Sequence, residues 1–307
     1  MSKNLNKLSP IVIFVYNRLK HTQITIEALQ NNHLAGESDL YIFSDAPKSD
    51  VDFAKTEEVR KYISQINGFK SIKIVERKAN FGLAKSIVDG VTKVVSKHER
   101  IIVLEDDMVT SPYFLTYMNE ALDKYAGDDR VASIHGYVYP VKRSLPETFF
   151  LRGADCWGWA TWRRGWSLFN PNGQYLLDEL RKRKLVNEFN FNGAYSYSKM
   201  LEEQINGANN SWAVRWHASA FLAEKLTLYP GRSLVNNIGN DASGTHCGES
   251  NTHDVVLSST PIDLSFIEVL PSVVGSKAFE KFFRYYQGGL VKRMQCFFIG
   301  ILRKLVT

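Results

Sequence analysis

Residues 101–107 constrain the fold of this chain more than any other segment. Four apolar residues run without interruption and then meet three consecutive acids, Glu105, Asp106 and Asp107, which we call the acid triplet. Such a short apolar run is typical of a strand buried on both faces of a parallel sheet. Ligands of open α/β sheets bind beyond the carboxyl ends of the strands, so we expect a binding site here. The alternative is a helix N-terminus, where acids face the positive end of the dipole.

The first 107 residues alternate between strand and helix patterns. The sequence predicts strands over 11–16, 40–43, 71–75 and 101–104, and helices over 21–31, 51–66 and from 82 onward. This alternation predicts an α/β fold with a mostly parallel sheet flanked by helices and right-handed crossovers. A helix over 113–125 and a strand over 131–139 follow. The strand order brings Asn17, Asp45, Arg77 and the acid triplet to one edge of the sheet.

The basic charge lies at one end of the chain. Of a net charge of +6, residues 276–307 supply seven basic groups against one acid, and the remainder is neutral. A neutral body argues against a nucleic-acid partner. Three cysteines without CxxC spacing favour a reducing cytoplasm over a disulfide framework or a zinc site. We expect neither a signal peptide nor a membrane-spanning helix, because no apolar run reaches ~18–20 residues.

We divide the chain into one large domain, residues 1–262, and a tail, residues 263–307. The domain has two halves, over about 1–110 and about 111–262, which we call the donor half and the acceptor half because of the family resemblance described below. In the tail, apolar residues recur at helical spacing with basic residues between them. Amphipathic cationic helices lie on anionic membranes, so we predict that residues 276–307 bind such a surface. The alternative is a helix packed on the body or on a partner.

A divalent cation is the natural partner of the acid triplet. Adjacent carboxylates repel one another, and Mg²⁺ or Mn²⁺ takes oxygen ligands while leaving positions for phosphate. His246, in a glycine-containing loop, is a candidate for the same metal or for a phosphate, although a lone histidine is usually structural or solvated.

Several other polar residues are candidates to bind a phosphate-bearing substrate. Asn80 and Gly82, followed by Lys85, have the pattern of a helix N-terminus, with Asn80 as cap and backbone N–H groups free for a diphosphate. An ordinary cap is the alternative. Asp45 could accept hydrogen bonds from a nucleobase or ribose, or could be a surface carboxylate in a turn. Asn17 and Arg18 leave the same choice open. Arg77 could face a phosphate, or could pair with a neighbouring acid.

All six tryptophans fall between residues 157 and 216. Buried indole N–H groups need partners, so clusters such as Trp157 and Trp159 are often placed for recognition, and sugars stack on such rings. The alternative is a packed aromatic wall.

The acid triplet resembles the variant metal motif of GT-A glycosyltransferases. The order of features is similar to that of N-acetylglucosaminyltransferase I and of bacterial family-2-like sugar transferases from polysaccharide gene clusters. Residues 151–159 resemble the acceptor-side segment of that family, residues 211–215 its Asp-Trp-x-x-Arg segment, and residues 244–246 its Gly-x-x-His loop. The resemblance covers roughly residues 10–250.

The resemblance implies a metal-dependent transferase that uses a nucleotide-diphosphate sugar, most simply a UDP-sugar, and inverts the anomeric centre. Asp107 would bind the metal, with His246 as a further candidate, and Asp106 and Glu105 would hold ribose and sugar hydroxyls. The remaining expected donor ligands are Asn17, Arg18, Asp45, Arg77, Asn80 and Lys85. The expected acceptor ligands are Trp157, Trp159, Trp212 and Arg215.

The chain departs from the family pattern at the general base. The resemblance places an acid directly before the Trp-x-x-Arg unit, but Ser211 stands there. Another carboxylate must take the proton of the acceptor hydroxyl, and we name Glu203, Asp155 and Asp241 as candidates.

The acceptor is expected to be a saccharide, lipid-linked, in bacterial surface polysaccharide synthesis at the inner face of the cytoplasmic membrane. One alternative is a nucleotidyltransferase, although the segment after the first strand lacks the glycine-rich loop that such enzymes carry. Another is a non-catalytic, membrane-associated member of the fold, which Ser211 leaves open.

Overall fold

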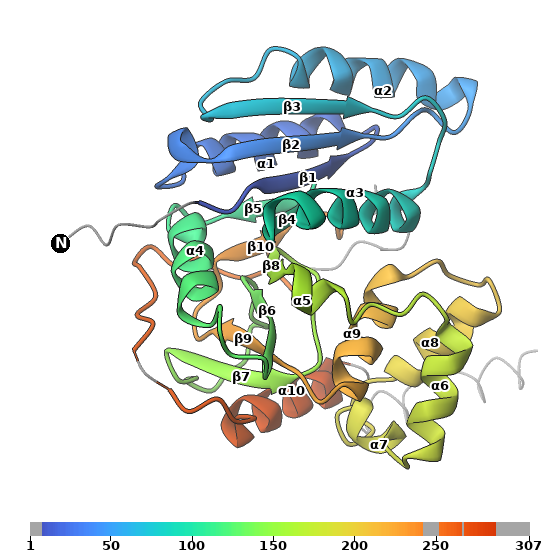
Figure 1. Cartoon of the computed structure of the whole chain (residues 1–307), viewed down its shortest axis with the longest axis vertical. Helices are drawn as coiled ribbons and strands as arrows, with labels where there is room; N and C mark the ends of the chain where they lie inside the picture. The colour runs from blue at the N-terminus through green and yellow to red at the C-terminus, as the bar shows by residue number, and fades with distance from the viewer. Residues whose placement is uncertain (1–7, 242–251, 266, 287–307) are drawn as a thin grey trace, which may run out of the picture.

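The computed structural model describes residues 8–241, 252–265 and 267–286 and has a large central sheet flanked by helices (Figure 1). The sheet has the strand order β3 (Ser71–Glu76), β2 (Asp39–Ser44), β1 (Ile11–Val15), β4 (Arg100–Glu105), β8 (Trp159–Trp162), β6 (Val131–His135), β9 (Leu226–Pro230) and β7 (Thr148–Arg152). β1 to β4 run parallel, β8 is antiparallel to β4 and β6, and β7 is antiparallel to β9. The predicted mostly parallel α/β sheet is confirmed.

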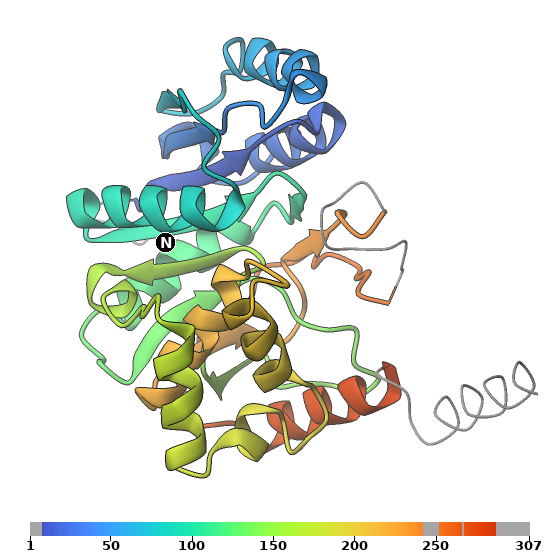
Figure 2. The ribbon, with the colours of Figure 1, turned by 90° about the vertical axis from the view of Figure 1, so that its right-hand side faces the viewer.

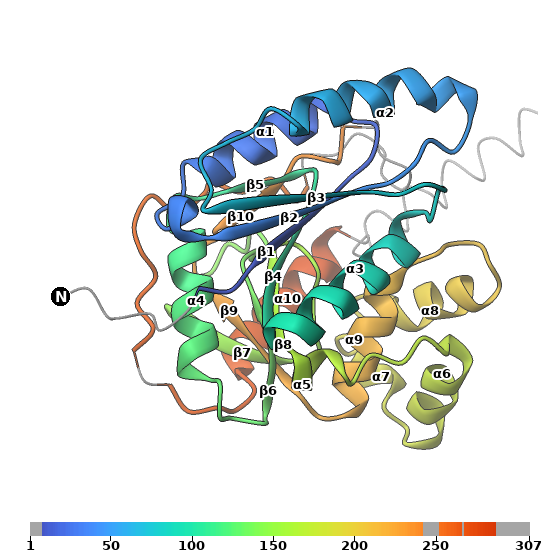
Figure 3. The ribbon, with the colours of Figure 1, turned by 45° about the horizontal axis from the view of Figure 1, so that its top comes forward.

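Helices cover both faces of this sheet (Figure 3). One face packs against α1 (Leu19–Gln30), α2 (Asp50–Ile63) and α4 (Phe114–Lys124), with the short turn η1 (Ala35–Glu37) following α1. The other face packs against α3 (Leu83–His98), α5 (Arg163–Trp166) and α9 (Trp212–Leu222). In α3, Ile87, Val91 and Val94 recur at spacings of three and four, so one stripe of the helix is buried.

The acid triplet lies between two strands. β4 ends at Glu105, and β5 (Met108–Thr110) starts directly after Asp107 and pairs antiparallel with β10 (Val235–Asn237). The helix α4 begins only at Phe114. The alternative that placed the acids at a helix N-terminus is therefore wrong.

A second group of helices stands beside the sheet. α6 (Gly173–Lys182), α7 (Val186–Phe189) and α8 (Tyr197–Ile205) pack with α9 around a core of their own. Figure 1 shows this group to one side of the strands. It forms part of the acceptor half predicted from the sequence.

The C-terminal helix α10 (Val273–Tyr286) corrects the division at residue 262. Phe279, Phe282 and Phe283 are buried against Phe149 of β7 and Tyr229 of β9, so this helix belongs to the body (Figure 2). The buried phenylalanines of α10 are not free to contact a membrane, and membrane binding by residues 276–307 stays a prediction. Residues 287–307 lie outside the described residues. In the part of the chain that the structure describes, no helix combines the length and the apolar character needed to cross a bilayer.

Candidate active site

The guanidinium of Arg18 binds two acids of the triplet. Its Nη2 atom donates to Oδ1 of Asp106 and, at 2.7 Å, to Oδ2 of Asp107. The loop between β1 and α1 therefore supplies a cation to the carboxyl end of β4. Thr25 of α1 fixes the backbone as well, because its hydroxyl donates to the carbonyl of Asp106 at 2.8 Å. Arg18 therefore brings the end of β1 into contact with the end of β4, although the sequence prediction of converging strand ends named its neighbour Asn17 and not Arg18.

Burial and mutual repulsion dominate the electrostatics of the acids. Burial, together with the charges of Asp107 and Asp106, raises the pKa of Glu105 to about 8. Burial also raises the pKa of Asp106 to about 6, although Arg18 opposes this shift. Burial alone would lower the pKa of Arg18, but the charges of Asp106 and Asp107 raise it above its ordinary value. The site is built to receive positive charge.

Asp107 has the surroundings expected of a side chain that binds a metal. It is 8% exposed, and its buried Oδ1 atom has no hydrogen-bond partner within the part of the chain that the structure describes. Gly239, just after β10, approaches so closely that a Cβ there would lie 2.2 Å from Oδ2 of Asp107. No three metal-ligating side chains gather among the described residues. A Mg²⁺ or Mn²⁺ ion at this position would use Asp107 together with substrate phosphates and water, as Mg²⁺ commonly does.

The loop before α3 differs from its prediction. Both oxygens of the Asp45 carboxylate accept backbone N–H groups, from Phe81 at 2.9 Å and from Gly82 at 2.8 Å. These N–H groups are therefore not free for a diphosphate. Gly82 is the N-cap residue, with a φ of 69°, and Asn80 instead donates to the carbonyl of Ala46. The prediction of Asn80 as helix cap is wrong, and contact of Asp45 with a nucleobase stays a prediction.

The other donor candidates also have internal partners. Arg77 is buried, pairs with Asp89 of α3 at 2.5 Å and lies between the rings of Phe43 and Phe81. The sequence offered Glu76 and Asp45 as its partners, and the described residues place Asp89 there instead. Lys85 lies over the ring of Phe81. Asn17 donates to Asp52 of α2 at 2.9 Å. Their contact with a donor stays a prediction.

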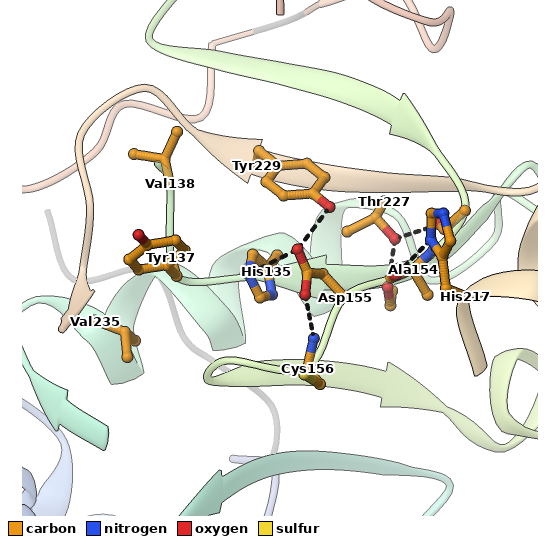
Figure 4. Close-up of polar contacts among 12 residues, drawn as sticks. His135, Tyr137, Val138, Ala154, Asp155, Cys156, His217, Thr227, Tyr229 and Val235 are labelled. Atoms are coloured by element: carbon orange, nitrogen blue, oxygen red, sulfur yellow. Dashed lines mark hydrogen bonds and ion pairs between the residues drawn. The ribbon is translucent and has the colours of Figure 1, made fainter. Parts of the chain in front are cut away.

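Asp155, on the acceptor side, lies in a polar cluster (Figure 4). Its Oδ1 atom accepts the backbone N–H of Cys156 at 2.8 Å, and its Oδ2 atom accepts the Tyr229 hydroxyl at 3.5 Å. His135 Nε2 lies 3.7 Å from the same Oδ2 atom. The side chain of Asp155 is 19% exposed, so it is held by its neighbours and still reaches the surface.

Cys156 links this cluster to the acid triplet. Burial raises the pKa of the Cys156 thiol well above its usual range, and the charges of Asp155, Glu105 and Asp107 raise it further. The thiol therefore lies within electrostatic range of both sets of carboxylates. Topology agrees, because β6 is parallel to β4 through their shared antiparallel neighbour β8, and His135 ends β6.

The tryptophans divide into two groups. Trp159 and Trp212 are 1% and 3% exposed and pack with Trp166 and Trp216 into one core cluster. The prediction that Trp159 and Trp212 stack on an acceptor is wrong, because protein covers both rings. Trp157 is half-buried and packs edge-on against Tyr137, with the two ring centroids 4.8 Å apart. It remains a candidate acceptor ligand.

Of the four remaining candidates, Glu203 and Arg215 lie on α8 and α9, and His246 falls outside the described residues. Asp241 lies near the acid triplet, two residues after Gly239. Glu203 is on α8, in the helical group beside the sheet, with its carboxylate 3.9 Å from Lys199 Nζ. Asp241 pairs with His21 of α1 at 3.1 Å. Arg215 of α9 donates to the carbonyls of Ser211 and Pro171, so an acceptor role for it stays a prediction.

The sequence reasoning missed His135, Tyr229 and Gly239. The sequence predicted one strand over 131–139, which placed His135 in the middle of a strand. In the structure β6 ends at His135, and the N–H of Gly136 donates to the carbonyl of Gly158 at 2.7 Å. A strand ending at a polar residue before glycine was the available signal. Tyr229 lies inside a strand, where no motif distinguishes it.

A family model described as "Glycosyl transferase family 2" matches residues 11–200, which include the acid triplet and Asp155. The chain belongs to glycosyl transferase family 2. It is therefore a glycosyltransferase with a GT-A fold, and the resemblance seen in the sequence is confirmed. The nucleotidyltransferase alternative does not agree with this family, and a test of donor hydrolysis decides the non-catalytic alternative.

No curated protein matched this family 2 chain. Among solved structures, a mannosyltransferase from Pyrobaculum calidifontis in complex with GDP-Man and Mn²⁺ is 13% identical, with a TM-score of 0.32, over 43% of this chain and 35% of that one. S. aureus TarS, residues 1–349, is 12% identical, with a TM-score of 0.35, over 53% and 48%. The matched part spans less than half of either structure.

Proposed function

We propose that this family 2 glycosyltransferase moves a sugar from a nucleotide-diphosphate sugar, with a UDP-sugar as first choice, to a saccharide acceptor. The observation that carries the proposal is the buried, unpartnered Oδ1 atom of Asp107, beside Asp106 and Arg18 at the carboxyl end of β4. Buried polar atoms are normally satisfied, so an exception calls for a ligand. A Mn²⁺ or Mg²⁺ ion bound there would neutralise the charge of the donor diphosphate.

Asp155 is the proposed general base of an inverting, direct displacement. Asp155 faces His135 at the end of β6, which runs parallel to β4 with only β8 between them, whereas Glu203 stands in the helical group beside the sheet. Asp155 would accept the proton of the acceptor hydroxyl while the acceptor oxygen attacks the anomeric carbon. A general base is typically worth ~10²–10⁴ in rate, so Asp155→Asn should lower kcat within that range and spare donor binding.

The half-buried Trp157, two residues after Asp155, supports a saccharide acceptor, since an aromatic ring can stack on a sugar face. We further propose that the acceptor is lipid-linked, as in bacterial surface polysaccharide synthesis, and that the enzyme works at the inner face of the cytoplasmic membrane. This part of the proposal depends on the basic residues Lys292, Arg293, Arg303 and Lys304. Each basic group near an anionic surface contributes ~1 kcal/mol.

Two experiments test these proposals. The first screens UDP- and GDP-sugars with and without Mn²⁺ by thermal shift, because a ligand that binds the native state raises apparent stability. A Mn²⁺-dependent shift that Asp107→Asn abolishes supports the site, and an equal shift in that variant refutes it. The control is Asp129→Asn, which removes an exposed acid.

The second experiment tests whether the C-terminal residues bind an anionic membrane. The chain truncated after residue 286 should lose binding to phosphatidylglycerol vesicles and keep its hydrolysis of nucleotide sugar. Equal vesicle binding by the truncated and full chains would exclude this role.

A further inference from the structure

His135 is a buried ionisable residue without a hydrogen bond. It ends β6, is 0% exposed, and neither Nδ1 nor Nε2 has a hydrogen-bond partner among the described residues. A buried imidazole in this position disfavours folding, and an apolar ring of similar size would avoid that cost. The polar ring therefore calls for an explanation other than packing.

Asp155 is the charged group that faces this ring. Its Oδ2 atom lies 3.7 Å from His135 Nε2, just beyond hydrogen-bond distance, and Figure 4 shows the two side chains pointing toward each other. The ring of Tyr229 packs against the imidazole at 5.0 Å and places its hydroxyl on the same oxygen. His135 is closed to solvent, while Asp155 is partly exposed, so the facing carboxylate is the route by which a proton could reach the imidazole.

Arg152 of β7 lines the same pocket as Asp155, and its guanidinium is paired with Glu188 at 3.0 Å. The phenols, the thiol and the second imidazole around the pair carry no charge at neutral pH. Burial raises the pKa of each nearby phenol and of the Cys156 thiol, and lowers the pKa of the nearby imidazole. These groups come from the segment after β6, from α8, α9 and β9, and from the loop before β8: Tyr137, Tyr139, Tyr197, His217, Tyr229 and Cys156.

We propose that His135 is a positioning residue that receives from Asp155 the proton released by the acceptor hydroxyl. The inference rests on the proposed function. The acceptor oxygen bonds to the anomeric carbon, and the bond from that carbon to the diphosphate oxygen breaks with its electron pair on the diphosphate. The hydroxyl proton passes to Oδ2 of Asp155 and then to Nε2 of His135, which leaves a carboxylate facing an imidazolium. The proton later returns through Asp155 to solvent.

The protonation state before reaction suits this role. Burial lowers the pKa of His135 below its ordinary value, and the charge of Asp155 opposes the shift only in part. The imidazole is therefore neutral at pH 7 and has a nitrogen free to accept. The 3.7 Å separation must close during the step, and apo structures often show catalytic contacts in such a lengthened form.

The first test compares His135→Gln and His135→Phe in the full chain. Glutamine keeps a polar group beside Asp155 but does not titrate in this range. Release of UDP from UDP-sugars with Mn²⁺ gives kcat, KM and the pH profile. Both variants should lose about tenfold in kcat at unchanged KM, and the acidic limb of the profile should move to lower pH, because the imidazole no longer takes up the proton. Wild-type kcat and profile in His135→Gln would overturn the proposal. His33→Gln, an exposed control, should match the wild type.

The second test needs no donor. NMR titration of ¹⁵N-histidine-labelled wild type and Asp155→Asn reports the pKa of His135 directly. Removal of the facing charge should lower that pKa by about one unit, and an unchanged value would overturn the pairing. If the wild type turns over no nucleotide sugar, the proposed function fails, yet this titration still decides whether the two side chains are coupled.

Discussion

Nη2 of Arg18 lies 2.7 Å from Oδ2 of Asp107, in the part of the site where the metal and the donor diphosphate are proposed to bind. The protein thus supplies a cation of its own to acids that are otherwise buried together. Burial of two adjacent carboxylates without a counter-charge is costly, which gives Arg18 a structural role beside any contact with phosphate.

Substitution of Arg18 by Gln should therefore destabilise the fold. The side chain is 18% exposed, and loss of one partner of such a pair costs about 3 kcal/mol in the free energy of unfolding, measured by urea in EDTA. Millimolar Mn²⁺ should restore part of the loss, because an ion that binds only the folded state stabilises it. A variant as stable as wild type in EDTA would show that Arg18 does not neutralise the acids.

Gly239→Ala should weaken donor binding. A Cβ there would lie 2.2 Å from Oδ2 of Asp107 and 3.2 Å from Nη1 of Arg18, so the carboxylate must move. We expect an affinity for UDP and Mn²⁺ about tenfold lower by calorimetry, which corresponds to about 1.4 kcal/mol. Gly127→Ala, which has no neighbour within 4 Å, serves as the control. Equal affinities of the two variants would contradict the placement of the site.

Trp159→Ala and Trp157→Ala should differ in kind. Trp159 is fully buried, so its truncation should cost about 3–5 kcal/mol of unfolding free energy in urea. Trp157→Ala should cost less and should raise the KM for a saccharide acceptor. The reverse order of stabilities would mean that the tryptophan cluster is not core.

Phe279→Ala should destabilise the whole body. Its ring is 1% exposed, so we expect a loss of about 3–5 kcal/mol, whereas Tyr285→Ala, at a side chain 64% exposed, should stay within about 0.5 kcal/mol. Urea unfolding of both variants checks this. A silent Phe279→Ala would mean that α10 does not pack on the sheet in solution.

Stability should depend on His217 below neutral pH. Burial lowers its pKa in the folded chain, while Ala154 and Asp155 oppose the shift. The unfolded chain, with a pKa near ~6.5, takes up a proton that the folded chain does not, so unfolding free energy falls as pH drops, by up to about 1.4 kcal/mol per unit. His217→Gln should show a shallower slope between about pH 6.5 and 5 than wild type and His33→Gln. Identical slopes would contradict the shift.

The sequence predicted the features that depend on local pattern. The apolar run before Glu105 indicated a buried strand, and parallel topology placed Asn17, the neighbour of Arg18, at the same edge as the acid triplet. It could not predict which polar atoms would satisfy one another. Asp45 is occupied by backbone N–H groups of the loop before α3, and Arg77 by Asp89, because folding brings those partners close.

Burial was the second limit. Trp157 and Trp159 are two positions apart in one aromatic segment, yet one is half-buried and the other lies in the core, since their surroundings come from α9 and β6. The amphipathic pattern of residues 276–286 likewise fits a membrane surface and a sheet equally well. The packing on the sheet depends on the apolar rings of Phe149 in β7 and Tyr229 in β9, and the pattern of residues 276–286 does not reveal those rings.

The most direct test of the account is a crystal of the full chain soaked with UDP and Mn²⁺. We predict an anomalous scattering peak for Mn²⁺ within bonding distance of Oδ1 of Asp107 and of the diphosphate, close to the acid triplet. A diphosphate bound elsewhere, with the Asp107 carboxylate still facing Arg18 alone, would contradict it.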